Sequence, residues 1–585
     1  MATSTTRSVI LVKNGRVYDH AGDVHLPPVA DLLIVDGIIA AARAGIAAAV
    51  GRGETLAELG TRAIDQTIDA TDKLLMPGFV NAHYHSHDVL LKGCFETIPL
   101  ELWLLSALPP SYPKRSTAEI RARTLVGALE CLRSGMTTVQ DLATIYPFDE
   151  GHLEAILQAY EDIGIRCVFA LQFTDTAGAK SIPFWEEVVP AERRGALAGA
   201  VEPFQGVDLP KLLRDIVTSQ RRRHPRIALA LGPTSPERCT PALLQDLAEL
   251  SDTEKLPVYT HLYESRAMTL IARQTHAAED GGSLISYLKR VGLLTPRMNL
   301  AHSVWMLPAE IDSIAEAGAH VVLNPVGNLK TRSGVAPIRT YLRKGLRPAL
   351  GCDNCSCSDA QNMFQSMKLF AGLAAVSQPE PGPPTAADAI WSATVGGART
   401  AGLEGQIGAL QPGMAADLSI IDLTDPSFVP LNSVARQIVF TEAGRGVETV
   451  IVDGRVVIAD RKVTTIDERA LREEVADLMK VLRRDVEAVT RRTNAMLPYL
   501  MEAQRKTWQV DIGLNRYVGN ATTEIFSLAP ARFFARFRAE PRVGMERVCV
   551  EYGNGHAGLQ SVSSIPSGKP ASIGCRIANE EGLEP

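Results

Sequence analysis

Residues 76–93 read MPGFVNAHYHSHDVLLKG, and this stretch decides how the fold is interpreted. The apolar segment over residues 75–81 is typical of a buried β-strand, and it leads directly to His83 and His85. In extended backbone, residues i and i+2 face the same side, so these two imidazoles can bind one metal ion. The pair alone is a weak signal, because two histidines also line ordinary polar pockets.

Seven more strand candidates follow, and helical patterns separate them. Eight strands with intervening helices over about 320 residues predict an α/β fold, a (β/α)₈ TIM barrel with insertions that spans residues 76–400. An open doubly wound sheet is the alternative, but no G-x-G-x-x-G motif follows the first strand, so dinucleotide binding has no support. The further candidates cover residues 137–141, 166–173, 226–232, 256–262, 298–303, 320–324 and 347–353.

Side chains that bind metals or move protons stand at the ends of three later strands. His261 ends the fifth strand with Glu264 just beyond it, His302 ends the sixth, and Asp353 ends the eighth. TIM-barrel active sites lie at the carboxyl ends of the strands, so we expect these side chains to meet, with Glu264 as a proton shuttle. Three histidines and one aspartate suit zinc, leave room for water, and are acceptable to Fe²⁺ or Mn²⁺. The predicted ligands of the single divalent ion are His83, His85, His261 and Asp353.

Cys352, Cys355 and Cys357 offer a competing metal site. Their C-x₂-C-x-C spacing can hold thiolate-bound zinc or an iron–sulfur cluster. No second C-x₂-C pair accompanies them, so we expect three free thiols near a strand end. The chain has nine cysteines without the spacing of a disulfide framework, which favours a cytoplasmic location.

Composition narrows the classes of partner. Hydrophobic residues make up 46% of the chain and charged residues 22%, with a net charge of −6. These values are typical of a globular protein and give no general attraction for nucleic acid or an anionic membrane. No run approaches the roughly 20 apolar residues of a membrane helix, and the first residues lack a signal peptide's apolar core. The expected partner is a small molecule.

The two ends of the predicted barrel share a β-rich pattern. Short strands over residues 1–75 and 401–462, with turn signals at Asn14-Gly15, Asp36-Gly37 and Asp453-Gly454, predict one small β-sandwich domain made from both ends. Two separate terminal domains are the alternative. Residues 463–510 form a predicted helical extension, and the apolar spacing over 468–507 indicates a surface or dimer helix. Residues 511–585 remain unassigned.

Several motifs together resemble the amidohydrolase superfamily, in the branch that contains the triazine hydrolases and the S-adenosylhomocysteine/methylthioadenosine and guanine-type deaminases. The similarity extends over residues 8–460, about four fifths of the chain, and the motifs are specific in combination. They read MPGFVNAHYHSHDVLLKG, IPLELWL, SGMTTVQD, LGPTSPERCT, THLYES, AHSVW, LNPVGNLKTRSGVAP, LGCDN and GQIGALQPGMAADLSIID.

The resemblance implies a single zinc or iron ion on the four ligands given above. It also implies that Glu264 shuttles a proton, that His302 orients the water or polarises the substrate, and that Asp353 takes part in catalysis beside the ion. The fourth strand carries no lysine that could be carbamylated to bridge a second metal. A homodimer or a higher homo-oligomer is expected. The expected substrate contacts are His87, Trp103, Thr234, Asn324 and Asn354.

Two departures from the family pattern bear on the substrate. Thr234 stands where the adenosine-type deaminases commonly have histidine, and Asn354 follows Asp353 where glycine is frequent. Thr234 disfavours a nucleoside substrate, and the segment that begins at Asn354 alters the rim of the pocket. We expect deamination of a cyclic amidine or amino-heterocycle by metal-activated hydroxide. The alternatives are amide or urea hydrolysis, triazine-type dechlorination at the same site, and a non-catalytic assembly protein, which the intact ligand set argues against.

Overall fold

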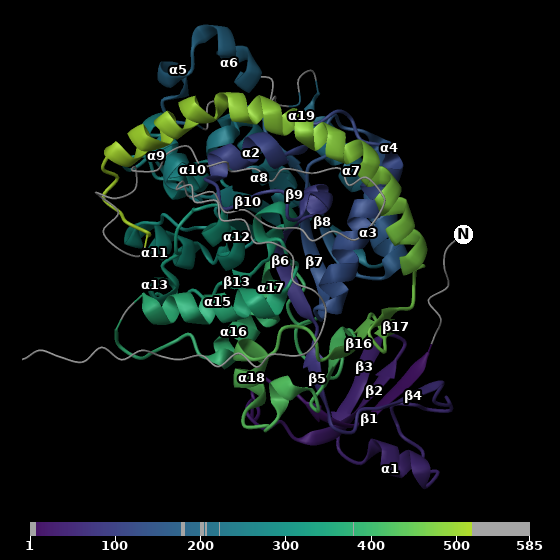
Figure 1. Ribbon diagram of the computed structural model, residues 1–585. Coiled ribbons are helices and arrows are strands. Elements are labelled where there is room, and N and C mark those ends of the chain that lie inside the picture. The colour runs from purple at the N-terminus through teal and green to yellow at the C-terminus, as the bar shows by residue number, and fades with distance from the viewer. Residues whose placement is uncertain are drawn as a thin grey trace, which may run out of the picture. The chain divides into compact units, whose positions relative to one another are not determined.

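The structure of the chain is a computed structural model. It describes residues 8–176, 182–198, 204, 207–221, 223–377 and 379–517 (Figure 1). Most of the unassigned segment 511–585, with Cys549 and Cys575, lies outside the described residues.

A closed parallel barrel forms the centre of the fold and confirms the predicted TIM barrel. The strands follow one another around the barrel in chain order, and β14 pairs with β6 through Asp353 and Tyr84. The eighth strand is interrupted at Gly351 and Cys352, so it appears as β13 and β14. The barrel strands are β6 (Phe79–His85), β7 (Met136–Ala143), β8 (Arg166–Phe173), β9 (Ile227–Pro233), β10 (Val258–Leu262), β11 (Met298–His302), β12 (His320–Leu323), β13 (Ala349–Leu350) and β14 (Asp353–Asn354).

Helices alternate with these strands, and many begin at a side chain that accepts a hydrogen bond from a first-turn amide. Ser116, Asp149 and Thr240 do so for α3, α4 and α8, which stabilises each helix start. The helices between the strands are α2 (Leu100–Ala107), α3 (Thr117–Arg133), α4 (Glu150–Ile163), α5 (Trp185–Val188), α6 (Ala191–Ala198), α7 (Leu209–Gln220), α8 (Pro241–Glu254), α9 (Arg266–Thr275), α10 (Leu284–Arg290), α11 (Pro308–Ala317), α12 (Pro325–Lys330) and α13 (Ile338–Arg343). After the barrel come α14 (Cys355–Ser358), α15 (Met363–Val376), α16 (Ala386–Ala393), α17 (Val395–Thr400) and α18 (Val434–Phe440).

A second sheet is built from both chain ends, as predicted. Its order is β18-β17-β16-β15-β5-β1-β2-β3, with β4 on β1, so late strands continue directly into early ones. The junction is antiparallel and pairs Leu75 with Ile420. Two separate terminal domains are thereby excluded. Its strands are β1 (Val9–Val17), β2 (Val29–Val35), β3 (Ile38–Arg43), β4 (Gln66–Asp69), β5 (Lys73–Pro77), β15 (Leu418–Asp422), β16 (Val447–Val452), β17 (Arg455–Ala459) and β18 (Lys462–Val463), and α1 (Ile46–Gly51) packs on β1 and β2.

Two local predictions differ from the structure. Asn14-Gly15 is no hairpin turn: β1 continues through it, with a register shift and Asn14 at φ 63°. A β-bulge needs this conformation as much as a turn does, so the dipeptide signal is ambiguous. The predicted strand over 75–81 is two strands, since β5 ends at Pro77 in the small sheet and β6 begins the barrel at Phe79.

The C-terminal extension is one long helix, α19 (Glu468–Gln509), which packs across α2, α3, α5 and α9 (Figure 1). Its apolar residues Val486, Met496 and Leu500 share a buried cluster with Leu102 and Trp103 of α2. The apolar stripe expected for a surface or dimer helix is thus covered by the chain itself. Among the described residues, no helix combines the length and apolar character that crossing a membrane requires.

Candidate active site

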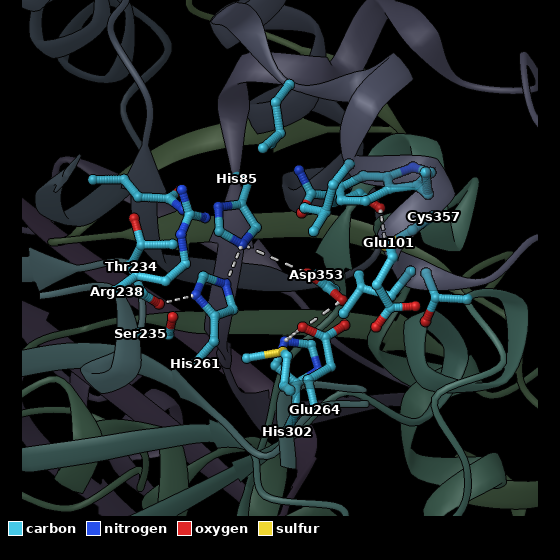
Figure 2. Close-up of a pocket in the computed structure, with 18 of the residues that line it drawn as sticks. His85, Glu101, Thr234, Ser235, Arg238, His261, Glu264, His302, Asp353 and Cys357 are labelled. Atoms are coloured by element: carbon cyan, nitrogen blue, oxygen red, sulfur yellow. Dashed lines mark hydrogen bonds and ion pairs between the residues drawn. The ribbon is translucent and has the colours of Figure 1, made fainter. Parts of the chain in front are cut away.

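A cavity with about 670 Å³ of empty space opens at the carboxyl ends of the barrel strands (Figure 2). Side chains from β6, β10, β11 and β14 form its floor, and α2 contributes Leu100, Glu101, Trp103 and Leu104 to its wall. The cavity therefore lies where the sequence predicts the active site, at the carboxyl ends of the strands.

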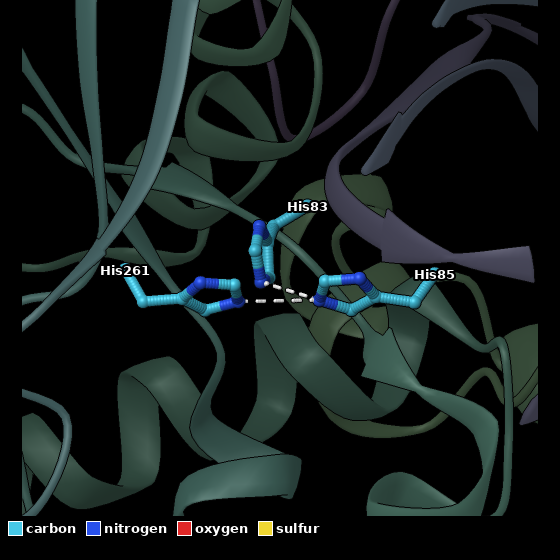
Figure 3. Close-up of side chains that lie close together, drawn as sticks. All are labelled: His83, His85 and His261. Atoms are coloured by element: carbon cyan, nitrogen blue, oxygen red, sulfur yellow. Dashed lines mark hydrogen bonds between the residues drawn. The ribbon is translucent and has the colours of Figure 1, made fainter. Parts of the chain in front are cut away.

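Three histidines converge at the floor (Figure 3). Nε2 of His85 lies 3.1 Å from Nε2 of His83 and 3.4 Å from Nε2 of His261. Nδ1 of His85 donates to the Leu142 carbonyl at 2.6 Å, and Nδ1 of His261 donates to the Thr234 carbonyl at 2.5 Å. Each of these two rings therefore directs an Nε2 lone pair at its neighbours, which is a repulsive arrangement that a cation at the centre relieves.

Asp353 completes the donor set. Its Oδ1 lies 3.6 Å from Nε2 of His83 and 3.5 Å from Nε2 of His85. His83, His302 and Asp353 also form a group whose ligand atoms lie within 4.8 Å of one another, as do His83, His85 and His261. The imidazole nitrogens and the carboxylate suit a divalent ion such as zinc. The four predicted ligands are thus brought together, and His302 borders the same space.

A buried polar network fixes the segment that carries Asp353. Asn81 accepts a hydrogen bond from the Cys352 amide at 2.9 Å and donates to Gln361 at 2.8 Å, and Gln361 donates to the Asp353 carbonyl at 2.8 Å. Gly351 permits close packing beneath it, since a Cβ there would lie 2.8 Å from the His83 backbone nitrogen. Position 351 therefore needs glycine for space.

Strained backbone accompanies the reactive side chains. His302 has φ 67° and Asp353 has φ 66°, a region that side-chain-bearing residues rarely adopt. Such conformations cost about 1–3 kcal/mol each and cluster at functional sites. Both residues stand directly at the ends of barrel strands.

Burial keeps the floor histidines neutral. It lowers the pKa of His83 and His85 well below the usual value, and it lowers the pKa of His261 and of His302 to about 4. The main cause in each case is desolvation of the charged ring. Neutral imidazole is the form that binds a metal, so the environment favours the role that the sequence predicted.

Glu264 and His302 form the proton-handling side of the site. Oε2 of Glu264 lies 3.5 Å from Nε2 of His302, and burial together with nearby Asp353 raises the pKa of Glu264 well above its usual value. Nδ1 of His302 donates to Oδ1 of Asn328 at 2.7 Å. Nε2 of the neutral ring is then an acceptor. Glu264 is thus more readily protonated than an exposed glutamate, and Nε2 of His302 can accept a proton.

Four of the five predicted substrate contacts line the cavity, and Asn324 does not. Asn324 is fully buried against the ring of His302, with its Nδ2 3.4 Å from Nδ1 and 3.3 Å from Nε2. Trp103 reaches the wall and donates to Ser356 at 2.9 Å, while the Thr234 hydroxyl donates to the Phe173 carbonyl at 2.7 Å. The two remaining predicted contacts that line the cavity are His87 and Asn354.

Sequence reasoning missed three charged residues of the cavity wall, Glu101, Glu237 and Arg238. Glu101 is buried, and it accepts hydrogen bonds from Ser265 and from Gln504 of α19. Burial raises the pKa of Glu101. Arg238, on the 3₁₀ turn Pro236–Arg238, is also buried. The one available signal was their place in the motifs IPLELWL and LGPTSPERCT, where each is a charged residue among mostly uncharged ones.

The cysteine run does not form a metal site among the described residues. No group of converging ligand-type side chains there includes a cysteine. Cys357 donates to the Asn354 carbonyl at 3.4 Å, and burial raises the pKa of Cys352 to about 12. Neutral buried thiols are poor ligands, in agreement with the expected free thiols.

A closed parallel barrel with a histidine–aspartate cluster and a buried carboxylate at its strand ends defines a metal-dependent hydrolase. The chain belongs to the Amidohydrolase family, whose model matches residues 74–457. It is an enzyme of the class that hydrolyses carbon–nitrogen bonds other than peptide bonds.

The chain aligns with curated relatives over most of their length. A 5'-deoxyadenosine deaminase of Methanothermobacter thermautotrophicus is 30% identical over 70% of this chain and 87% of that protein. A 5-methylthioadenosine/S-adenosylhomocysteine deaminase of Desulforudis audaxviator is 32% identical over 75% of this chain and 93% of that protein. Both similarities support the family assignment.

Solved structures share the fold. An adenosine deaminase from Xanthomonas campestris with bound zinc superposes with a TM-score of 0.68 at 24% identity, covering 81% of this chain and 98% of that one. An atrazine chlorohydrolase from Arthrobacter aurescens, complexed with zinc, has a TM-score of 0.68 at 23% identity, covering 80% and 99%. Both likenesses support the assignment of the fold.

Proposed function

We propose that this chain is a zinc-dependent deaminase that hydrolyses the exocyclic C–N bond of an amino-substituted nitrogen heterocycle or a cyclic amidine and releases ammonia. The observation that carries the proposal is the placement of Glu264, a buried carboxyl group of raised pKa, beside His302 and the histidine–aspartate cluster. Curated relatives at 30–32% identity are deaminases of adenine nucleosides, which favours C–N bond hydrolysis on a ring.

The ligands in this proposal are His83, His85, His261 and Asp353. A divalent ion held by them supplies Lewis acidity and lowers the pKa of a water molecule at the floor of the cavity. Leu142 and Thr234 orient two of the imidazoles through their carbonyls, so the donor atoms need no rearrangement to bind.

Three side chains, Asp353, His302 and Glu264, transfer the protons in this proposal. Asp353 and Nε2 of His302 are acceptors positioned over the floor, 3.9 Å apart, and take the proton released when water adds to the ring carbon. Protonated His302 then lies between two carboxyl groups and can stabilise negative charge on the reacting centre. Glu264 delivers a proton to the leaving nitrogen, which turns a poor leaving group into ammonia.

The test combines metal analysis with a product assay. Purified protein is assayed on aminopurines, aminopyrimidines, aminotriazines, a chlorotriazine and aryl amides, and released ammonia, amine and chloride are measured. We expect ammonia release, zinc bound to the chain, and loss of both in Asp353→Asn. Asp359→Asn, the same change outside the cavity lining, is the control.

Other outcomes would contradict the proposal. Chloride or amine release without ammonia would assign the site to dechlorination or amide hydrolysis. Protein without a bound divalent ion whose behaviour is unchanged in Asp353→Asn would end the metal-dependent assignment. Light scattering tests a further part of the proposal, that the chain forms a homodimer or a higher homo-oligomer; a monomer would refute it.

A further inference from the structure

The cavity wall contains a guanidinium group without a partner. Arg238 is 6% exposed, and its Nε and Nη2 are buried with no hydrogen-bond acceptor among the described residues. It is also the only arginine or lysine among the described residues that line the cavity. An uncompensated buried charge is costly for a protein to keep.

No carboxylate of the cavity is paired with it directly, although the charge of Glu237 acts on it and favours its protonated form. Glu101, Glu237, Glu264 and Asp353 line the same cavity, yet none of them forms an ion pair with Arg238 in the structure. Glu237, its chain neighbour, instead accepts a hydrogen bond from Ser235 at 2.8 Å. In Figure 2, Arg238 lies on the side of Thr234, Ser235 and His261, and Glu101 lies on the other side of Asp353.

The backbone holds Arg238 in place. Its amide donates to the Ser235 carbonyl at 3.1 Å, and its own carbonyl accepts a hydrogen bond from Thr174. The residue stands four positions after Thr234, whose hydroxyl is engaged by the Phe173 carbonyl. On this side of the cavity, the guanidinium is therefore the cationic group with unused hydrogen-bonding capacity, while Oε2 of Glu237 is an acidic atom without a hydrogen-bond partner among the described residues.

We propose that Arg238 binds an anionic oxygen group of the substrate, a carboxylate in the first instance, while the ring amine is hydrolysed at the floor. This inference rests on the proposed deaminase function and adds the substrate class, an amino-heterocycle with an acidic substituent. A planar guanidinium matches a carboxylate through two parallel hydrogen bonds. Substrate binding then supplies the hydrogen-bond acceptors that Nε and Nη2 of Arg238 lack among the described residues.

The turnover test uses paired substrates and variants. Zinc-loaded wild type, Arg238→Met and Arg238→Lys are assayed for ammonia release from an aminopyrimidine carboxylate and its carboxamide. We expect wild type to prefer the carboxylate, and Arg238→Met to lose at least ~30-fold in kcat/KM on it, the lower end for breaking a buried charge pair. Turnover of the carboxamide should change little. Equal loss on both compounds would overturn the proposal.

Two further readouts separate this proposal from the deaminase function and from a folding defect. Arg238→Met should melt no lower than wild type, because it removes a buried charge without breaking a pair; a clear fall in Tm would make Arg238 structural and overturn the proposal. Benzoate should raise the Tm of zinc-loaded wild type but not of Arg238→Met, with benzamide as the neutral probe and inorganic phosphate testing the other anion. If neither pyrimidine is deaminated, the deaminase proposal fails. The benzoate result alone then decides whether Arg238 binds an anionic group.

Discussion

Shortening one side chain of α19 tests whether the C-terminal helix belongs to the cavity wall. Val486 is 3% exposed and shares a cluster with Leu102 and Trp103 of α2, whereas Val481 on the same helix is 50% exposed. Val486→Ala removes two methyl groups, about 1.6 kcal/mol of transfer free energy, and the residual cavity raises the cost to about 2–3 kcal/mol. Val481→Ala loses roughly half the transfer term and leaves no enclosed cavity.

Alanine has a better helix propensity than valine by about 0.5 kcal/mol. This gain is common to both variants and cancels in their comparison. Val486→Ala should therefore be about 1–2 kcal/mol less stable than Val481→Ala.

The measurement is urea unfolding of the zinc-loaded full chain. The free energies of unfolding of the two variants are compared provided that the dependence on urea concentration (the m-value) is the same for both. Because α2 carries Glu101 and Trp103 into the cavity, Val486→Ala should also lower kcat/KM for ammonia release while the zinc content stays the same. Equal stabilities for the two variants would show that α19 does not dock as described. If Val486→Ala also lost zinc, the lower kcat/KM would come from a disturbed metal site at the floor and not from the cavity wall.

Three further changes test residues that lie on barrel strands or directly after them, at Glu264, Asp141 and Gly351. Glu264→Gln should lower kcat by about 10²–10⁴-fold with zinc retained; near-normal turnover would remove its shuttle role. Burial raises the pKa of Asp141 to about 6, so its contribution to stability is complete below the unfolded pKa of about 3.9 and is lost as pH rises through 6. Asp141→Asn should flatten the fall in unfolding free energy between pH 4 and 7, and an unchanged fall would contradict this. Gly351→Ala should displace His83, whose backbone nitrogen would lie 2.8 Å from the new Cβ, and reduce zinc content; full occupancy would refute the spacing argument.

The convergence of the floor side chains could be predicted from the sequence because these residues lie on or next to predicted strands. A buried strand is a run of apolar residues, so a histidine or aspartate at its end is conspicuous, as His261 and Asp353 are. Barrel geometry then brings all carboxyl ends to one face, and no distances are needed to expect convergence. His83 and His85 face the same side because side chains two residues apart on a strand point in the same direction.

The cavity wall could not be predicted in this way. Glu101 lies on α2, a short helix that is buried on nearly every side, and Arg238 lies on a 3₁₀ turn, so neither element shows a contrast of polar and apolar faces that would say which side faces the substrate. The apolar stripe of α19 was visible, but an amphipathic pattern does not state whether its partner is another copy or the same chain. Asn324 shows the converse: it follows a barrel strand, yet it packs against His302 instead of lining the cavity.

The two halves of the site also come from different parts of the chain. The four predicted metal ligands and Glu264 lie within residues 74–457, the range that the family model matches, whereas Gln504, which donates to Glu101, lies beyond it. Arg266, two residues after Glu264, contacts carbonyls of the same extension at Thr507, Val510 and Leu514. The extension thus touches both the wall helix and the segment that carries Glu264, the proposed proton shuttle. Changes in α19 can therefore alter which ring fits the cavity and how Glu264 is held without altering a metal ligand, so we expect substrate choice to depend on residues outside the shared family region.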